Sequence, residues 1–193
     1  METQSINKKK LTTKTIVRIA ILAALECVIA PFAIPLGANL APITLFTLVV
    51  YLFSYCLTPF ETTMGTFIYI LLGAVGLPVF SGAQGGLGKL FGPTGGYIFG
   101  YLFLAVICAF STKLFPKNRL LQIVGMVIGT AVLYLFGTIW FTIVYKTDFL
   151  SALLMCVLPY LLGDALKIAV AVVFGPMVRN ALLRAKLIAP IKE

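Results

Sequence analysis

Two charged residues, Asp164 and Lys167, lie inside the apolar stretch PYLLGDALKIAV. A charge near the centre of a bilayer costs about 2.5–3.5 kcal/mol on insertion scales, so such residues usually pair or face a polar cavity. Their i, i+3 spacing places both side chains on one face of a helix. A carboxylate accepts hydrogen bonds and an ammonium donates them, so together they suit a small polar ligand. The alternative is an ion pair that only fixes this helix in a bundle.

The stretch 76–100, GLPVFSGAQGGLGKLFGPTGGYIFG, is the second candidate, because it holds nine of the 17 glycines. Each glycine inside a helix costs roughly 1 kcal/mol relative to alanine, and Pro93 disfavours helix at Gly92. We therefore predict an ordered loop that covers a ligand, with a flexible external loop as the alternative. Its contact residues would be Gly88 and Gly92, which allow close backbone approach, and the polar Gln84, Lys89, Thr94 and Tyr97.

Six apolar side chains in this stretch argue against a solvated loop, because each gains about 1.5–3 kcal/mol on burial. We expect them to pack inward: Leu77, Val79, Phe80, Leu87, Leu90 and Phe91. The segment lacks the GxxxxGK[ST] pattern of a phosphate-binding loop, and it follows no soluble strand.

The composition places these residues in a membrane. Of 193 residues, 61% are apolar and 11% charged, and the mean hydropathy is +1.07. Soluble domains average about 45–50% apolar and about 25% charged residues. We predict an all-α integral membrane protein with one domain, residues 1–193, of which 1–14 form a polar N-terminus.

Six apolar segments of near-bilayer length must position the candidate residues. They run over about 15–34, 42–59, 62–77, 96–114, 120–145 and 150–178, and Pro159 is expected to kink or restart the last one. Twelve basic residues flank one side of the predicted bundle, whereas Lys89 and Lys146 flank the other. By the positive-inside rule, both termini are cytoplasmic and the glycine-rich stretch is extracellular.

The net charge of +9 comes from basic residues at the ends of the apolar segments. We therefore expect anionic lipid headgroups as their counter-charge and no nucleic acid as a partner. The four cysteines, Cys27, Cys56, Cys108 and Cys156, fall singly in separate apolar segments, and the chain has no histidine. A metal site and a histidine-dependent catalytic centre are therefore not expected. No paired acid and base and no activated nucleophile is visible, so we predict no catalytic residues and no enzyme.

Segment 15–34 contributes two further candidates. Ala20 and Ala24 form a small-xxx-small surface that permits close helix approach, either within the chain or to a partner. Glu26 is an intramembrane acid on the same segment. It is expected to be protonated, hydrogen-bonded or part of a proton path.

The blocks GLPVFSG, LFGPTGGYIFG and PYLLGDALKIAVA resemble the BioY family, the biotin-specific substrate-binding (S) components of energy-coupling-factor (ECF) transporters. The likeness covers the whole chain, including the Asp-x-x-Lys element at Asp164 and Lys167. It implies a bacterial plasma-membrane protein with six transmembrane helices, whose ordered extracellular loops cover a ligand pocket.

The resemblance also implies partners and roles. Ala20 and Ala24 match the element with which S components are thought to dock on a transmembrane coupling subunit. Two ATPase subunits would supply energy, since this chain has no Walker motif and needs no cofactor of its own. Asp164 would accept from the ureido nitrogens of biotin and Lys167 would donate to the ureido oxygen. The valerate carboxylate would lie near the loop amides, Lys89 or Asn39.

A proton-driven secondary transporter, with Glu26 and Asp164 as carriers, is the alternative function. The chain is short and shows no inverted repeat, which argues against this class. A membrane enzyme is a third reading, without a constellation to support it.

Overall fold

The computed structural model describes residues 12–34 and 43–188. Asn39 lies outside these residues. The described chain is mainly helical, and its one short hairpin pairs β1 (Ala33–Ile34) antiparallel with β2 (Ile43–Thr44). The helices are α1 (Thr13–Ile29), α2 (Phe46–Cys56), α3 (Pro59–Ala74), α4 (Leu87–Leu90), α5 (Gly95–Leu114), α6 (Arg119–Tyr145), α7 (Phe149–Cys156) and α8 (Leu158–Arg184).

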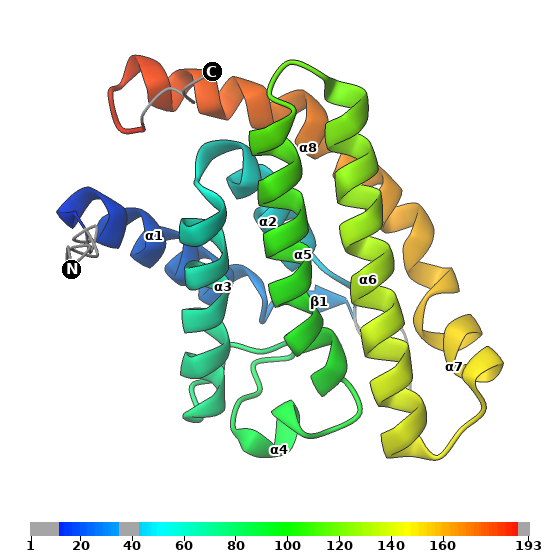
Figure 1. The fold of residues 1–193 in the computed structure, drawn as a ribbon. Helices are drawn as coiled ribbons and strands as arrows, with labels where there is room; N and C mark the ends of the chain where they lie inside the picture. Colours follow the sequence, from blue (N-terminus) through cyan, green and yellow to red (C-terminus); the bar gives the residue numbers. More distant parts are fainter. Residues whose placement is uncertain (1–11, 35–42, 189–193) are drawn as a thin grey trace, which may run out of the picture.

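The antiparallel pair α5 and α6 forms the most extensive contact between helices (Figure 1). Helix α5 also packs against α2 and α3, while α8 packs against α2. Helix α1 crosses α3 obliquely, and the short α4 lies at one end of the bundle (Figure 1). The core between these helices contains fully enclosed aromatic rings from different elements, among them Phe46, Tyr51, Tyr69 and Phe80.

Three helices, α5, α6 and α8, are long and apolar enough to cross a membrane. Helices α1, α2 and α3 are shorter, with 17, 11 and 16 residues. The predicted sixth segment is interrupted at Val157, and α8 starts at Leu158 with Pro159 in its first turn. The restart at Pro159 is therefore confirmed, whereas the count of six spans stays a prediction.

Several helices begin where the sequence supplies a cap. Thr58 and Glu61 form a reciprocal capping box at the start of α3, with Pro59 in the first turn. Asn118 and Asp148 accept hydrogen bonds from the first amides of α6 and α7. These side chains satisfy amides that have no partner within the helix, which fixes where each helix starts.

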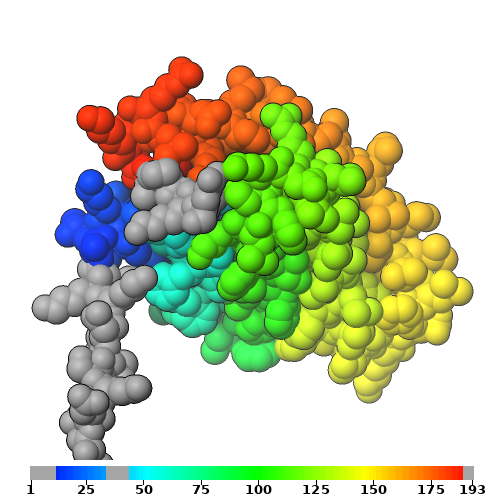
Figure 2. Space-filling view, turned by 45° about the horizontal axis from the view of Figure 1, so that its top comes forward, coloured from blue at the N-terminus to red at the C-terminus, as the bar shows by residue number. Residues whose placement is uncertain are grey.

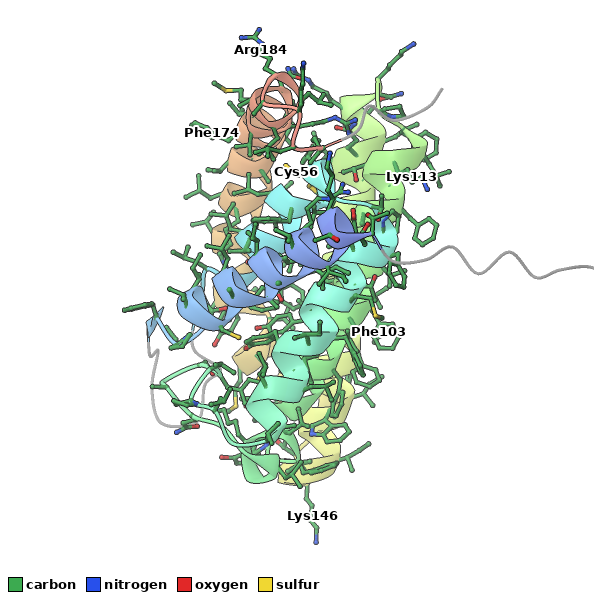
Figure 3. All side chains as sticks on the ribbon, turned by 90° about the vertical axis from the view of Figure 1, so that its left-hand side faces the viewer. Cys56, Phe103, Lys113, Lys146, Phe174 and Arg184 are labelled. Atoms are coloured by element: carbon green, nitrogen blue, oxygen red, sulfur yellow. The ribbon has the colours of Figure 1, made fainter. Side chains whose placement is uncertain are left out.

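Helix α8 bends near Pro176, which removes one hydrogen bond from the helix interior. Beyond this point its C-terminal part turns across the end of the bundle (Figure 1). In Figure 2 the C-terminal part of α8, in orange and red, lies against the green end of the α5–α6 hairpin. Lys113 and Arg184 lie at this end, and Lys146 lies at the opposite end (Figure 3).

The glycine-rich stretch is an ordered irregular segment up to Thr94, interrupted by the single turn α4. Phe80 and Gln84 exchange backbone hydrogen bonds of 2.8 and 3.3 Å. Gly86 has φ = 87°, and its amide donates to the Gly73 carbonyl at 2.7 Å, which ties the segment back to α3. The predicted absence of an ordinary helix before the fourth segment is thus confirmed.

The expected inward packing of this segment is partly wrong. Phe80 and Leu90 are buried and Val79 packs against the core, but Leu77, Leu87 and Phe91 are 47%, 58% and 60% exposed. The prediction assumed that an apolar side chain must find other protein. At a membrane, such a side chain can also contact lipid, so burial inside the chain is not required.

Candidate functional site: a polar cavity between α2, α5, α6 and α8

A cavity of about 70 Å³ lies where four helices, α7 and the glycine-rich segment meet. Four of the residues predicted from the sequence line it together: Asp164 and Lys167 of α8, Tyr97 of α5, and Thr94, which precedes α5. The irregular segment reaches the cavity through Ser81 and Thr94. The structure therefore brings the two candidate regions of the sequence to one place.

Asp164 is the centre of the hydrogen-bond network around this cavity, and its side chain is buried. Its Oδ1 accepts from Nζ of Lys167 at 2.7 Å and from Oγ1 of Thr47 at 3.3 Å. Its Oδ2 accepts from the hydroxyl of Tyr134. Helices α2, α6 and α8 thus converge on one carboxylate, which compensates the cost of enclosing its charge.

This network leaves hydrogen-bonding capacity for a ligand. A carboxylate has about four lone-pair positions, and the three donors above occupy three of them. The Lys167 ammonium has three N–H groups, of which one is directed at Asp164. Among the described residues, these contacts leave one acceptor position of Asp164 and two donors of Lys167 unused. The pair is consequently able to bind a group that carries both an N–H and a carbonyl oxygen.

The Thr94 hydroxyl has no hydrogen-bond partner among the described residues, although the atom is buried. It does not cap α5. A buried hydroxyl without a partner costs about 1–3 kcal/mol, so its retention beside a cavity points to a ligand contact.

Tyrosine side chains supply much of the remaining wall. Tyr97 and Tyr101 lie one turn apart on α5, and Tyr134 and Tyr160 face them from α6 and α8. The Tyr97 hydroxyl lies 3.3 Å from that of Thr138, and Tyr101 stacks on Phe46 at a centroid distance of 4.0 Å. These rings offer apolar faces, while their hydroxyls add polar contacts at defined positions.

Sequence reasoning missed Thr44, Thr47, Tyr101 and Tyr134 in this wall. Hydroxyl residues in apolar helices are common in cores, so their type alone does not identify them. The spacing of Tyr97 and Tyr101 is a usable signal, because i and i+4 share a helix face. Tyr134 and Thr47 have no comparable signal, since their role depends on helices that meet only in the fold.

Four predicted contact residues do not line the cavity: Gln84, Lys89, Gly88 and Gly92. Gln84 and Gly88 are exposed, and the Gly92 carbonyl accepts from Nε1 of Trp140 at 2.9 Å. Lys89 is half-buried, and burial lowers the pKa of its ammonium. Gln84 and Gly92 anchor the irregular segment through hydrogen bonds of their backbone, and none of the four residues lines the cavity in this structure.

The candidates on α1 lie apart from the cavity. Ala20 and Ala24 are exposed, and α1 packs on the bundle through other positions, including Leu22 and Ala23. Glu26 is fully enclosed at the contact with α3, where Thr66 donates to its Oε1 at 2.7 Å. The expectation that Glu26 is hydrogen-bonded is confirmed. It does not line the cavity.

An apolar helical bundle, three helices of membrane length and a polar cavity define a membrane protein with a candidate site for a small molecule. The chain belongs to the BioY family, whose family model matches residues 3–184. The family consists of transporter components and not of enzymes.

Two relatives and one solved structure show how similar this chain is to known proteins. The chain is 31% identical over 164 residues to the "Biotin transporter BioY2" of Lactococcus lactis subsp. cremoris, covering 85% of this chain and 89% of the relative. It is 32% identical over 158 residues to the "Biotin transporter BioY" of Thermotoga maritima, covering 82% and 91%. A crystal structure described as "the S-component for biotin from an ECF-type ABC transporter" matches with a TM-score of 0.80 and 25% identity, covering 92% of this chain and 95% of that chain.

Proposed function

We propose that this chain captures biotin from outside the cell as the substrate-specificity subunit of an ECF-type transporter. The observation that carries the proposal is the ion pair between the buried Asp164 and the partly buried Lys167 at the wall of a polar, tyrosine-lined cavity. Relatives named as biotin transporters, and a similar fold described as an S-component for biotin, support biotin as the ligand.

The ureido ring of biotin matches the unused hydrogen-bonding groups of Asp164 and Lys167. Its nitrogens are donors and its oxygen is an acceptor, so a nitrogen donates to Asp164 while Lys167 donates to the oxygen. The tyrosine rings flank the apolar bicyclic body of the ligand. The valerate then points toward the irregular segment, where the unpartnered Thr94 hydroxyl lies. Lys89 and Asn39 keep their proposed role at the outer end of the ligand.

Binding requires the cavity to enlarge. Its open volume of about 70 Å³ is well below the roughly 300–1,000 Å³ of typical ligand sites. The helices around it are closely packed, whereas residues 76–94 are mostly irregular. We therefore assign residues 76–94 the role of a lid that moves to admit biotin and then covers it.

The proposed topology has six spans, with both termini in the cytoplasm. It is supported by the position of Lys113 and Arg184 at one end of the bundle and Lys146 at the other (Figure 3). The test introduces one cysteine, at Lys146 or at Lys113, and labels intact bacterial cells with a membrane-impermeant maleimide. Labelling of Lys146→Cys alone is expected. Labelling of Lys113→Cys alone reverses the orientation.

We propose that the exposed face of α1 around Ala20 and Ala24 docks on a transmembrane coupling subunit. Two ATPase subunits attached to that subunit hydrolyse ATP and energise uptake. The support is the exposure of both alanines on a helix whose opposite face is packed, together with the ECF context of the similar structure.

The binding proposal is tested by calorimetric titration of biotin into purified protein with Asp164→Asn or Lys167→Met. Each change removes one charge-assisted hydrogen bond and is expected to weaken binding about 10- to 100-fold. Asp148→Asn is the matched control, because asparagine caps α7 equally well. Lys113→Met is the control for Lys167→Met, since Lys113 is exposed and far from the cavity. Unchanged affinity in both site variants refutes the assignment.

A proton-coupled transporter remains the alternative, with Glu26 and Asp164 as proton carriers. It predicts biotin uptake by the isolated chain in proteoliposomes under a proton gradient. The ECF proposal predicts uptake only with the coupling and ATPase subunits, and loss of uptake when the ATPases are inactivated at a constant gradient. Glu26→Gln also distinguishes the proton-coupled from the ECF-type mechanism, because this change abolishes uptake only if Glu26 carries the proton.

A further inference from the structure

A second cavity, of about 500 Å³, lies at the end of the bundle opposite α4. It is formed where α2 and α5 end, α6 begins and α8 bends. Its polar wall includes Tyr55, Lys117, Arg119, Arg179 and Asn180. None of the described residues that line it is acidic. This combination of size and charge favours an anionic ligand.

Arg179 is held at the cavity by a bond that leaves most of its donors free for a ligand. Its Nη1 donates to the backbone carbonyl of Tyr55 at 3.1 Å, and its side chain is half-buried. A guanidinium has five N–H donors in a planar fork that matches the oxygens of a phosphate group. The bend of α8 at Pro176 brings this residue over the end of α2.

Arg119 adds a second guanidinium from the other wall. It is the first residue of α6, a helix of 27 residues. The amino end of a helix carries partial positive charge, which favours an anion at the same place. Tyr55 also lines the cavity, and its backbone carbonyl is the acceptor for Arg179. Its hydroxyl interacts electrostatically with Arg119 and has no hydrogen-bond partner among the described residues.

We propose that this cavity binds a phosphate group, carried by an anionic phospholipid headgroup or present as a free phosphate ion. Two apolar residues close in sequence to the lining residues Pro116 and Arg119 are more than 60% exposed, namely Leu114 and Leu120. A phospholipid would place its acyl chains along such side chains and its phosphate between Arg119 and Arg179. This proposal does not rest on the assignment of biotin, because the cavity shares no lining residue with the first one.

The test uses native mass spectrometry of the purified full chain with phosphatidylglycerol, phosphatidylcholine or inorganic phosphate. We expect one retained phosphatidylglycerol or one phosphate per chain, and no retained phosphatidylcholine. The double variant Arg119→Gln/Arg179→Gln should lower this occupancy by about tenfold or more. The matched control Lys113→Gln/Arg184→Gln removes the same charge from exposed positions at the same end of the bundle and should retain the ligand.

The two sources of the phosphate give different results. Retention of phosphatidylglycerol that millimolar phosphate does not displace identifies a lipid site, whereas 1:1 phosphate binding without lipid preference identifies a site for the free ion. Equal losses in both double variants, or no 1:1 complex at all, overturn the proposal. Arg119→Gln alone keeps the test valid if the double variant misfolds, because Arg119 is exposed. It should lower occupancy while the thermal unfolding temperature in the absence of ligand stays unchanged.

Discussion

Nε1 of Trp140 donates a hydrogen bond of 2.9 Å to the carbonyl oxygen of Gly92, which joins α6 to the irregular segment just before α5. The indole ring also packs against Gly96, where a side chain would collide with it, and against Phe99 at a centroid distance of 5.7 Å. The C-terminal end of the proposed lid is therefore fixed to the bundle. Opening must involve the part of the segment that precedes Gly92.

Trp140→Phe should loosen this attachment without unfolding the bundle, because phenylalanine keeps a ring against Gly96 but removes the donor. A neutral hydrogen bond contributes about 0.5–1.5 kcal/mol, so amide exchange in residues 92–96 should accelerate by up to about tenfold. Hydrogen-exchange mass spectrometry measures this directly. Exchange in α2 and α3 serves as the internal control, and acceleration there as well would mean general destabilisation.

Biotin should slow amide exchange in residues 76–91 of the wild-type protein. The proposed lid closes over the ligand, and closure protects backbone amides that are otherwise free to open. Exchange is compared with and without saturating biotin. Equal protection in both states would count against the lid, although the binding site itself would stand.

Tyr134→Phe should weaken biotin binding by about 5- to 20-fold, because it removes one donor from Asp164 and shifts the carboxylate that holds the ligand. Tyr145→Phe is the matched control, since Tyr145 ends the same helix and its side chain is exposed. Fluorescence titration is suitable, because Trp140 is the single tryptophan of the sequence. An affinity equal to that of the control would remove Tyr134 from the site.

Gly137→Ala should destabilise the protein and weaken biotin binding together. The added Cβ would collide with the ring of Tyr97, which lines the cavity. Overpacking of this kind costs about 1–3 kcal/mol. Gly163→Ala on α8 is the control: no atom of the described residues lies within 4 Å of its added Cβ, and alanine favours helix by up to about 1 kcal/mol. Thermal unfolding in detergent should separate the two, and equal unfolding temperatures would contradict the packing argument.

Ala24→Leu should prevent co-purification with the coupling subunit while leaving biotin affinity unchanged. A larger side chain blocks close helix approach at a small-xxx-small surface, and Ala24 is exposed in the isolated chain. Ala169→Leu makes the same change at an exposed alanine of α8 and should not affect assembly. Intact assembly of Ala24→Leu would place the docking surface elsewhere.

The centre of the candidate site could be predicted from the sequence, because charged residues are rare inside the apolar helices of membrane proteins. Asp164 and Lys167 are conspicuous as charges in an apolar helix, and the start of α8 follows from Pro159. Thr94 and Tyr97 were predicted as contacts because they are polar residues of the glycine-rich stretch 76–100. In each case, local physical chemistry alone points to the residue.

The rest of the site depends on which helices meet, and local patterns do not contain that information. Tyr134 and Thr47 reach Asp164 from helices 30 and 117 residues away in the chain. Gly88 and Gly92 were predicted to approach a ligand, but Gly92 is engaged by Trp140 and Gly88 is exposed. A glycine-rich sequence indicates tight backbone turns. It does not indicate whether the nearby object is a ligand or the protein itself.

Helix α8 lines both cavities, and its bend at Pro176 turns its C-terminal part across the end of the bundle (Figure 1). Asp164 at one end and Arg179 at the other are separated by 15 positions, roughly 20 Å along a helix axis. Helix α8 therefore lines the polar cavity with residues of its first turns and the basic cavity with residues beyond the bend. If ligand entry tilts the first turns of α8, Arg179 at the basic cavity should therefore move as well, because both parts belong to one continuous helix.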